Sequence, residues 1–262
     1  MCLLAVAFQT QIDRPLIVTS NRDEFYRRPT EPMHWWPDAQ ILAGRDAEAG
    51  GTWMGVSRSG RFAAVTNFRQ LVAGAMPETK ALSRGHLVTD FLSSEKTVEQ
   101  WADSIAATMP DYGGFNLLLY DGLSLLYLNN HDGARRLLAP GIYALSNHFL
   151  DSPWPKVDHA REQLKQTIEA GQIGAAQLPE LIATLSLEKT YPPELLPDTG
   201  VPKDLEAQLS SPFIVADGYG TRASSAIIIS KQGEIVVAEH CFEAGETLGT
   251  QVFEFELSRA EL

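Results

Sequence analysis

Apolar positions at the start of the chain are grouped in a way that predicts β-strands. Residues 2–8 form one short apolar run, and residues 16–20 form a second run rich in β-branched side chains. Turn-forming residues lie between them at 11–15, so the two runs predict a hairpin. Because an antiparallel hairpin returns beside its own start, residues near 20 and the Asp23 that follows are predicted to lie close to Cys2.

The rest of the chain alternates between strand and helix patterns. Strands are predicted at 50–56, 61–67, 115–120, 125–128, 137–145, 213–215, 221–230, 234–242 and 250–257. Helical spacing and capping residues predict helices at 83–92, 97–109, 155–170 and 176–186. The stretch 27–40 holds three prolines, so we expect an irregular loop there. This order of elements predicts two sheets with helices outside them, in one α+β domain that spans residues 1–262.

Charge and composition narrow the classes of function. The net charge of −12 argues against a broadly basic nucleic-acid-binding protein. Basic residues are concentrated in the first 86 positions, which hold ten Lys or Arg against eight Asp or Glu. An anionic ligand is therefore expected to bind there. Two cysteines give no disulfide framework, and no apolar run is long enough for a membrane span or a signal peptide. These features predict a cytoplasmic protein.

Cys2 is the first candidate for chemistry. If Met1 is removed, Cys2 carries a thiol and a free α-amine, which have ordinary pKa values of about 8.5 and 8. Such a residue is a nucleophile with its own general base. The alternative is a small buried apolar residue at the end of the chain. Intact mass of the native protein distinguishes the two states of the terminus.

Polar residues at predicted strand ends complete a candidate catalytic set. Asp23 can orient the amine, Asn67 and Asn147 can donate to an oxyanion, and Arg222 opens an otherwise apolar strand. Each has an alternative interpretation, because Asn at a strand end is typical of turns and Arg at a strand start is typical of surface ion pairs. The candidate ligand-binding residues are Asn21, Arg22, Arg28, Trp53, Arg69 and Arg84.

These motifs together resemble a known family. The sequences Met1-Cys2, Asn21-Arg22-Asp23-Glu24, Gly51-Thr52-Trp53, Val65-Thr66-Asn67, Ser83-Arg84-Gly85, Leu145-Ser146-Asn147 and Thr221-Arg222-Ala223-Ser224 are similar to those of the NRDE-motif family, which includes the eukaryotic transport-and-Golgi-organisation protein two. The resemblance covers nearly the whole chain. It implies a four-layer αββα sandwich of the N-terminal-nucleophile hydrolase type.

The resemblance also carries expectations for the site. More distantly, the chain looks like choloylglycine hydrolases and penicillin-type acyltransferases, which implies Cys2 as the nucleophile with Asp23, Asn67, Asn147 and Arg222 around it. One position departs from that pattern, since those hydrolases carry Arg three residues before the Asp and this chain has Ser20. Arg22 is expected to point to the side of the strand opposite Asp23.

Two functions remain open at this stage. One is an enzyme that acts on an acyl amide or thioester, such as a lipid or an acyl-CoA. The other is a non-catalytic intracellular protein that binds or transports haem, acyl-CoA or another lipid in the same pocket. No cofactor is expected to be required, with haem as a candidate bound ligand. No metal spacing is evident among the histidines.

Overall fold

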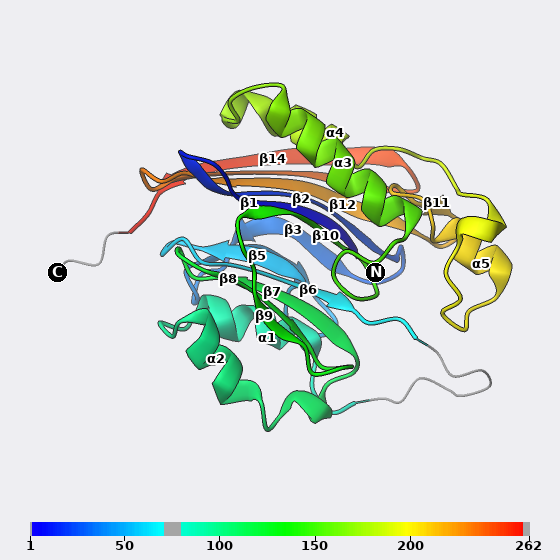
Figure 1. Ribbon diagram of the computed structural model, residues 1–262, viewed down its shortest axis with the longest axis horizontal. Helices are drawn as coiled ribbons and strands as arrows, with labels where there is room; N and C mark the ends of the chain where they lie inside the picture. Colours follow the sequence, from blue (N-terminus) through cyan, green and yellow to red (C-terminus); the bar gives the residue numbers. More distant parts are fainter. Residues whose placement is uncertain (1, 71–79, 259–262) are drawn as a thin grey trace.

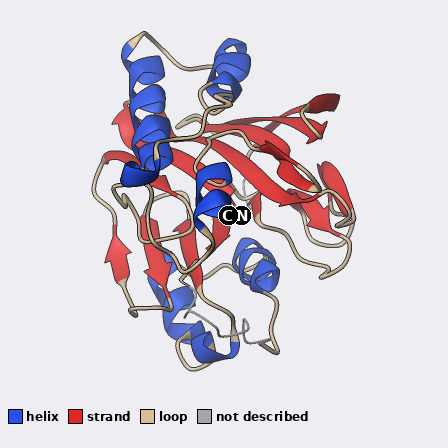
Figure 2. Cartoon of the chain, turned by 90° about the vertical axis from the view of Figure 1, so that its right-hand side faces the viewer, coloured by secondary structure: helices blue, strands red, loops and turns tan. Residues whose placement is uncertain are grey.

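A computed structural model describes residues 2–70 and 80–258 of the chain. Two antiparallel sheets lie face to face, and helices cover the outer face of each (Figure 1; Figure 2). The first sheet, sheet A, has the order β10-β1-β2-β12-β13-β14, with β11 paired to β12. The second, sheet B, has the order β3-β4-β5-β6-β7-β8-β9. The four-layer αββα architecture expected from the sequence is therefore confirmed.

The strand bounds follow the apolar runs. Sheet A consists of β1 Cys2–Gln11, β2 Arg14–Phe25, β10 Gly141–Leu145, β11 Val215–Ala216, β12 Tyr219–Ile229, β13 Glu234–Glu243 and β14 Glu246–Glu256. Sheet B consists of β3 Thr30–Trp35, β4 Ile41–Asp46, β5 Met54–Ser57, β6 Phe62–Asn67, β7 Phe115–Tyr120, β8 Leu125–Asn129 and β9 Arg135–Leu137.

The helices lie in two groups. On sheet B are α1 Arg84–Leu92 and α2 Val98–Ile105, and on sheet A are α3 Pro155–Glu169 and α4 Leu178–Ala183. Thr97 caps α2, as the sequence predicted, and it forms a capping box with Gln100. A short helix that the sequence did not predict, α5 Lys203–Gln208, follows the proline-rich connection.

Three apolar layers hold the sandwich together, and alternation along the strands decides which layer each side chain joins. Even-numbered residues of β1, from Cys2 to Phe8, face the core between the sheets. The odd-numbered Leu3, Ala5 and Ala7 face α3 and α4. The outer face of sheet B packs on α1 and α2. Helices therefore cover much of the outer face of each sheet, whereas β14 at the edge of sheet A is largely exposed.

Two sequence predictions were wrong. The stretch 27–40 contains a strand, β3, because β3 is the edge of sheet B and a bulge between Glu31 and His34 accommodates its proline. The single strand expected at 137–145 is two strands in different sheets. Pro140 lacks the N–H that a continuous strand requires, and the chain crosses from β9 to β10 at that point.

Candidate active site at the strand ends

Cys2 lies at the edge of a cavity between the two sheets. Its side chain is 6% exposed and lines a cavity of about 730 Å³. Both sheets and the start of α1 form the walls, which include Asp23, Gly44, Asn67, Gly85 and Arg222. The fold thus brings a thiol to a cavity large enough for a small-molecule ligand.

The register of sheet A places the Asn21–Glu24 motif beside Cys2. Cys2 pairs with Arg22, and Arg22 pairs in turn with Ala223 and Ala223 with Cys241. Residues opposite one another in antiparallel strands share a face, so this row faces the cavity. β1 runs away from Asp23, so the backbone nitrogen of Cys2 is on the side of the row nearest Asp23. The proximity predicted from the hairpin is confirmed.

Asp23 is on the other face of β2 and is 1% exposed. Its Oδ1 accepts a hydrogen bond from Thr221 Oγ1 at 2.8 Å, and Thr221 Oγ1 accepts one from the Ile214 N–H at 2.9 Å. Burial raises the pKa of the Asp23 carboxyl, and the positive charge of Lys156 opposes that rise. The carboxylate is therefore rigidly held at the end of the sheet.

The thiol of Cys2 is protonated at neutral pH. Burial raises its pKa to about 11, and the nearby Asp23 acts in the same direction. A thiol with this pKa needs a base within reach before it can attack a carbonyl carbon.

The two candidate amides are linked to each other and to Cys2. Asn67 lines the cavity at the end of β6. Asn147 is fully buried, and its Nδ2 donates to the Asn67 carbonyl at 3.0 Å. The Ser146 hydroxyl donates to the Cys2 carbonyl at 3.0 Å and to Asn147 Oδ1 at 3.2 Å. Asn67 is therefore on the cavity wall, whereas Asn147 lies behind it and fixes its backbone.

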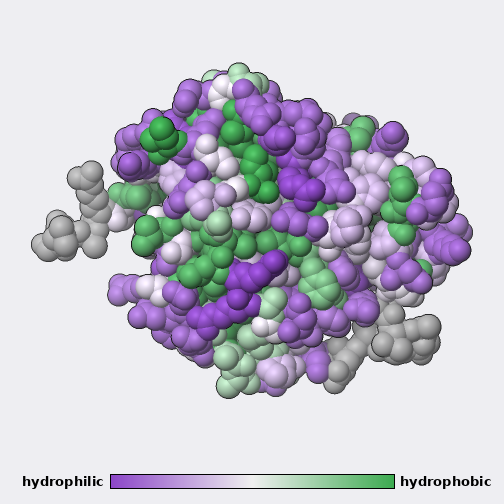
Figure 3. All heavy atoms as spheres, viewed as in Figure 1, coloured by the Kyte–Doolittle hydropathy of each residue, from purple (hydrophilic) through white to green (hydrophobic). Residues whose placement is uncertain are grey.

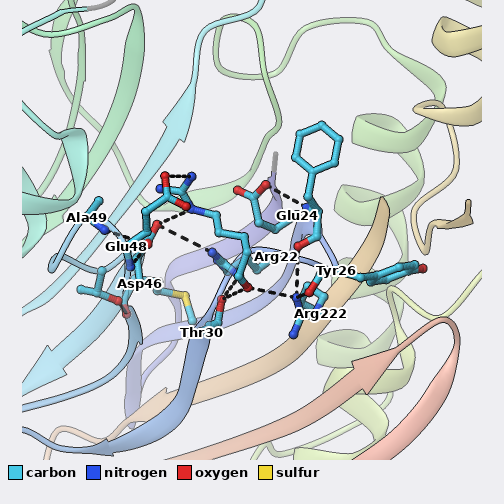
Figure 4. A network of polar contacts seen from close by, with 12 residues as sticks. Arg22, Glu24, Tyr26, Thr30, Asp46, Glu48, Ala49 and Arg222 are labelled. Atoms are coloured by element: carbon cyan, nitrogen blue, oxygen red, sulfur yellow. Dashed lines mark hydrogen bonds and ion pairs between the residues drawn. The ribbon is translucent and has the colours of Figure 1, made fainter. Parts of the chain in front are cut away.

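Arg222 is at a bulge in β12 between Thr221 and Ala223. Its guanidinium donates to the carbonyls of Tyr26, Phe25 and Phe242 at 2.9, 3.1 and 3.3 Å (Figure 4). These bonds tie the end of β2 to β13. Arg222 lines the cavity while most of its donors are engaged by backbone.

The candidate ligand-binding residues divide into two groups, of which the first lines the cavity. It consists of Arg22, Arg28, Trp53 and Arg84. Arg22 donates to Thr30 Oγ1 at 3.1 Å and lies 4.0 Å from Asp46, and Arg28 donates to Asp46 at 2.8 Å (Figure 4). Arg84, at the start of α1, donates to the Gly114 carbonyl at 3.1 Å, and burial lowers its pKa.

Asn21 and Arg69, the second group, are not among the described residues that line this cavity. Asn21 Nδ2 donates to the carbonyls of Leu185 and Pro212, both at 2.9 Å, beneath the helices on sheet A. Arg69 forms a salt bridge of 2.8 Å with Glu206 of α5. Asn21 thus holds loops against sheet A, and Arg69 ties the segment after β6 to α5. Asn21 faces away because strand alternation places it with Asp23 and not with Arg22.

The cavity wall contains one close backbone contact. A Cβ added to Gly51 would lie 2.6 Å from the carbonyl carbon of Gly85, and one added to Gly85 would lie 3.0 Å from the Thr52 nitrogen. The start of α1 therefore packs directly on the chain that enters β5.

Comparison with known proteins places this architecture in a family. The model of the family described as Transport and Golgi organisation 2 matches residues 1–244. The chain belongs to the Transport and Golgi organisation 2 family.

Members of the Transport and Golgi organisation 2 family from animals are similar along most of their length. The homologue from Bos taurus is 32% identical over 86% of this chain and 85% of its own. The homologue from Homo sapiens is 31% identical over the same shares of the two chains. The Drosophila melanogaster protein is 26% identical over 84% of this chain and 83% of its own.

Similar solved structures share less sequence identity with this chain than these relatives do. An N-acylethanolamine-hydrolyzing acid amidase orthologue of Caenorhabditis elegans is 12% identical with a TM-score of 0.48, over 87% of this chain and 92% of its own. The C2A variant of a conjugated bile acid hydrolase from Clostridium perfringens is 9% identical with a TM-score of 0.44, over 97% of this chain and 92% of its own.

Sequence reasoning missed two buried charged residues of this family member. Glu239 of β13 lines the cavity, is 2% exposed and accepts the Met33 N–H at 2.6 Å. An acidic residue inside the apolar run of β13 was the available signal. Lys156 is also 2% exposed and is close enough to Asp23 to influence its pKa. No local pattern distinguishes Lys156 from a solvated helix lysine.

Within residues 2–70 and 80–258, no helix is long and apolar enough to cross a membrane. The same residues hold no group of three or more His, Cys, Asp or Glu side chains arranged to bind a metal. Polar and apolar side chains are interleaved on the face seen in Figure 3, with apolar ones gathered near its middle.

Proposed function

We propose that this protein is an acyl hydrolase or acyltransferase that uses Cys2 as an N-terminal nucleophile. The observation that carries the proposal is the place of the Cys2 thiol on the wall of a large cavity, with its backbone nitrogen on the side of Asp23. The proposal requires removal of Met1, because only then is that nitrogen an amine that can accept a proton.

The reaction follows from the protonation state of the thiol. Because burial raises the pKa of the Cys2 thiol, the α-amine exposed by removal of Met1 takes the thiol proton as sulfur attacks the acyl carbon. The oxyanion that forms is stabilised by donors at Asn67. The leaving amine or thiol takes the proton from the ammonium, and a thioester to Cys2 remains. Water or another acceptor then attacks the thioester and restores the thiol.

The cavity lining favours an acylated anion as the substrate. Among the described residues, the lining holds six Lys or Arg side chains against five Asp or Glu, and Arg84 among them donates to a backbone carbonyl. Trp53 and Phe68 contribute apolar surface on the same walls. A carboxylate or phosphate has its counterpart in the arginines, and an acyl chain has its counterpart in the aromatic rings. An acyl-CoA thioester or an N-acyl amide with an anionic head satisfies both requirements.

The test combines intact mass with trapping of the acyl-enzyme. Native protein whose mass lacks Met1 is incubated with palmitoyl-CoA and an N-acyl amide panel, and the adduct is located by peptide mass. The adduct is expected on Cys2, absent from Cys2→Ala and present in Cys241→Ala, which removes the other cavity thiol. Turnover that survives Cys2→Ala would overturn the proposal.

The second candidate is non-catalytic binding of haem, acyl-CoA or another lipid in the same cavity. The engagement of Arg22, Arg28 and Arg222 with fixed partners favours it, because a pre-organised basic wall suits binding without chemistry. Among the described lining residues the side chains suited to bind haem iron are the thiols of Cys2 and Cys241. Titration with haemin and calorimetry with palmitoyl-CoA, in the absence of any turnover, would support this candidate.

A further inference from the structure

Arg84 differs from the other basic residues on the cavity wall in what holds its side chain. It is the first residue of α1, and its Nη1 donates to the Gly114 carbonyl at 3.1 Å. Within residues 2–70 and 80–258, no carboxylate forms an ion pair with it. A guanidinium carries several N–H donors in one plane, so Arg84 keeps donors for an anionic ligand.

The other described basic residues of the wall have partners of their own; they are Arg22, Arg28, Arg45, Lys80 and Arg222. The first two lie 4.0 and 2.8 Å from Asp46. The guanidinium carbon of Arg45 lies 4.6 Å from the centre of the Trp36 ring, which packs in the layer outside sheet B. Arg222 donates to backbone carbonyls at the end of β2.

Charges of both signs act on Arg84 without neutralising it. Glu24 favours its charged form and Arg28 opposes it. The Glu24 carboxylate accepts the Phe25 N–H at 2.8 Å, and the first turn of α1 holds no acidic side chain. An anionic group of the ligand would supply the counter-charge that the described residues leave out.

Hydrogen bonds tie Arg84 to the strand end that carries Asn67. The Gly114 carbonyl accepts both Arg84 Nη1 at 3.1 Å and the Phe68 N–H at 2.9 Å. Phe68 directly follows Asn67. A Cβ added to Gly113 would lie 3.1 Å from Arg84 Nη1, so the guanidinium rests directly on this main chain. Arg84 is therefore fixed beside the candidate oxyanion donors.

The same network continues from Asn67 to the nucleophile. Asn147 Nδ2 donates to the Asn67 carbonyl at 3.0 Å. Ser146 Oγ lies 3.2 Å from Asn147 Oδ1 and 3.0 Å from the Cys2 carbonyl oxygen. Cys2, Asn67 and Arg84 all line one cavity. A ligand whose acyl carbon is at Cys2 therefore has Arg84 on the wall that carries Asn67.

We propose that Arg84 binds the anionic group of the substrate, and that this group is only a few atoms from the acyl carbon. The inference rests on the proposed function for the place of that carbon. An acyl amide with a carboxylate beside the amide nitrogen meets the requirement. In an acyl-CoA the whole pantetheine arm separates the phosphates from the thioester. The position of Arg84 therefore favours the acyl amide.

The direct test is calorimetry in a Cys2→Ala background, where no chemistry at Cys2 occurs. N-palmitoylglycine and N-palmitoylethanolamine share the acyl chain and the amide and differ in charge. Arg84→Gln keeps an amide donor for the Gly114 carbonyl. It is expected to weaken N-palmitoylglycine binding about tenfold and to leave N-palmitoylethanolamine binding unchanged. Palmitoyl-CoA is expected to lose less affinity than N-palmitoylglycine.

Arg27→Gln is the control, because Arg27 is exposed and outside the described cavity lining. It is expected to leave the binding of all three ligands unchanged. The proposal would be overturned if N-palmitoylglycine did not bind, or if Arg84→Gln weakened the charged and the neutral amide equally. Equal losses for palmitoyl-CoA and N-palmitoylglycine would contradict the short distance between the anion and the acyl carbon.

A second measurement keeps Arg84 in place and covers the case in which Arg84→Gln does not fold. Phenylglyoxal modifies accessible guanidinium groups, and peptide mass locates the modified residues. In the Cys2→Ala chain, N-palmitoylglycine is expected to protect Arg84 several-fold more than N-palmitoylethanolamine does, with Arg27 modified equally. Equal modification of Arg84 with the two ligands would overturn the proposal. Neither measurement reads turnover, so failure of the proposed enzyme activity and failure of this binding role are distinguishable.

Discussion

The two faces of β2 at the end of sheet A perform different tasks with neighbouring residues. Arg22 and Glu24 face the cavity, where solvent and ligand have access. Asn21 and Asp23 are on the face of β2 toward the helices and are 0% and 1% exposed, and Asp23 also reaches the cavity lining at the end of the strand. A four-residue motif that reads as one polar cluster in the sequence is thus divided by strand alternation between a cavity-facing side and a helix-facing side. Residues that are neighbours in one motif can therefore lie in different environments.

The largest expected effect is a loss of stability, and it comes from Asn21 on the helix-facing side of β2. Asn21→Ala removes hydrogen bonds to Leu185, Pro212 and Ser224 and leaves buried partners unsatisfied. We expect the free energy of unfolding to fall by about 3 kcal/mol. Ser20→Ala, on the cavity side, is the matched control and is expected to cost less than about 1 kcal/mol. Equal losses in urea denaturation of the two variants would remove the distinction between the faces.

The second-largest expected effect is a pH dependence of the free energy of unfolding, and it comes from Lys156 on the helix side of sheet A. The folded-state pKa of Lys156, about 8, is below the ordinary 10.5, so between these values the unfolded chain binds more protons and stability rises with pH. Lys156→Met lacks this contribution. Across that pH window, the free energy of unfolding of the wild type is therefore expected to rise by about 2 to 3 kcal/mol relative to that of Lys156→Met. Denaturation at each pH measures it. A constant difference would show that Lys156 has an ordinary pKa.

The smallest effect is on the cavity side. Arg22→Gln removes a charge from the wall and is expected to weaken palmitoyl-CoA binding about tenfold, with a change in stability of about 1 kcal/mol. Arg27→Gln is the control, because Arg27 is exposed and outside the cavity lining. Calorimetry with palmitoyl-CoA at two salt concentrations measures the affinities of both variants. Equal affinities for the two variants would place the anionic part of the ligand elsewhere.

Local sequence pattern predicted the strands that determine the position of Cys2. The apolar runs and the turn at 11–15 were enough to place residues near 20 and Asp23 close to Cys2. The register itself, Cys2 opposite Arg22, depends on an irregularity between Phe8 and Gln11 that the pattern did not show. The strand ends at Asn67 and Asn147 were also predicted. Pattern did not show that Asn147 lies behind Asn67, since that depends on how the two sheets meet.

Residues far apart in the sequence account for what was missed. Lys156 is buried because the start of α3 meets the segment that carries Leu209, and no spacing within the helix reveals that contact. Arg69 was expected at the ligand but pairs with Glu206, which belongs to the unpredicted α5. β3 was missed because prolines exclude a central strand and the edge position of β3 was unknown.

The contact between Gly51 and Gly85 affects how the shape of this cavity can change over evolution. Two main chains touch there with no side chain between them, so the spacing of the walls is determined by atoms that every residue type shares. A methyl group at Gly51 would displace α1 and Arg84 together. The opening can therefore not be narrowed in small increments at this point. Differences in ligand size among related proteins are expected to come from the opposite wall, formed by β12 and β13.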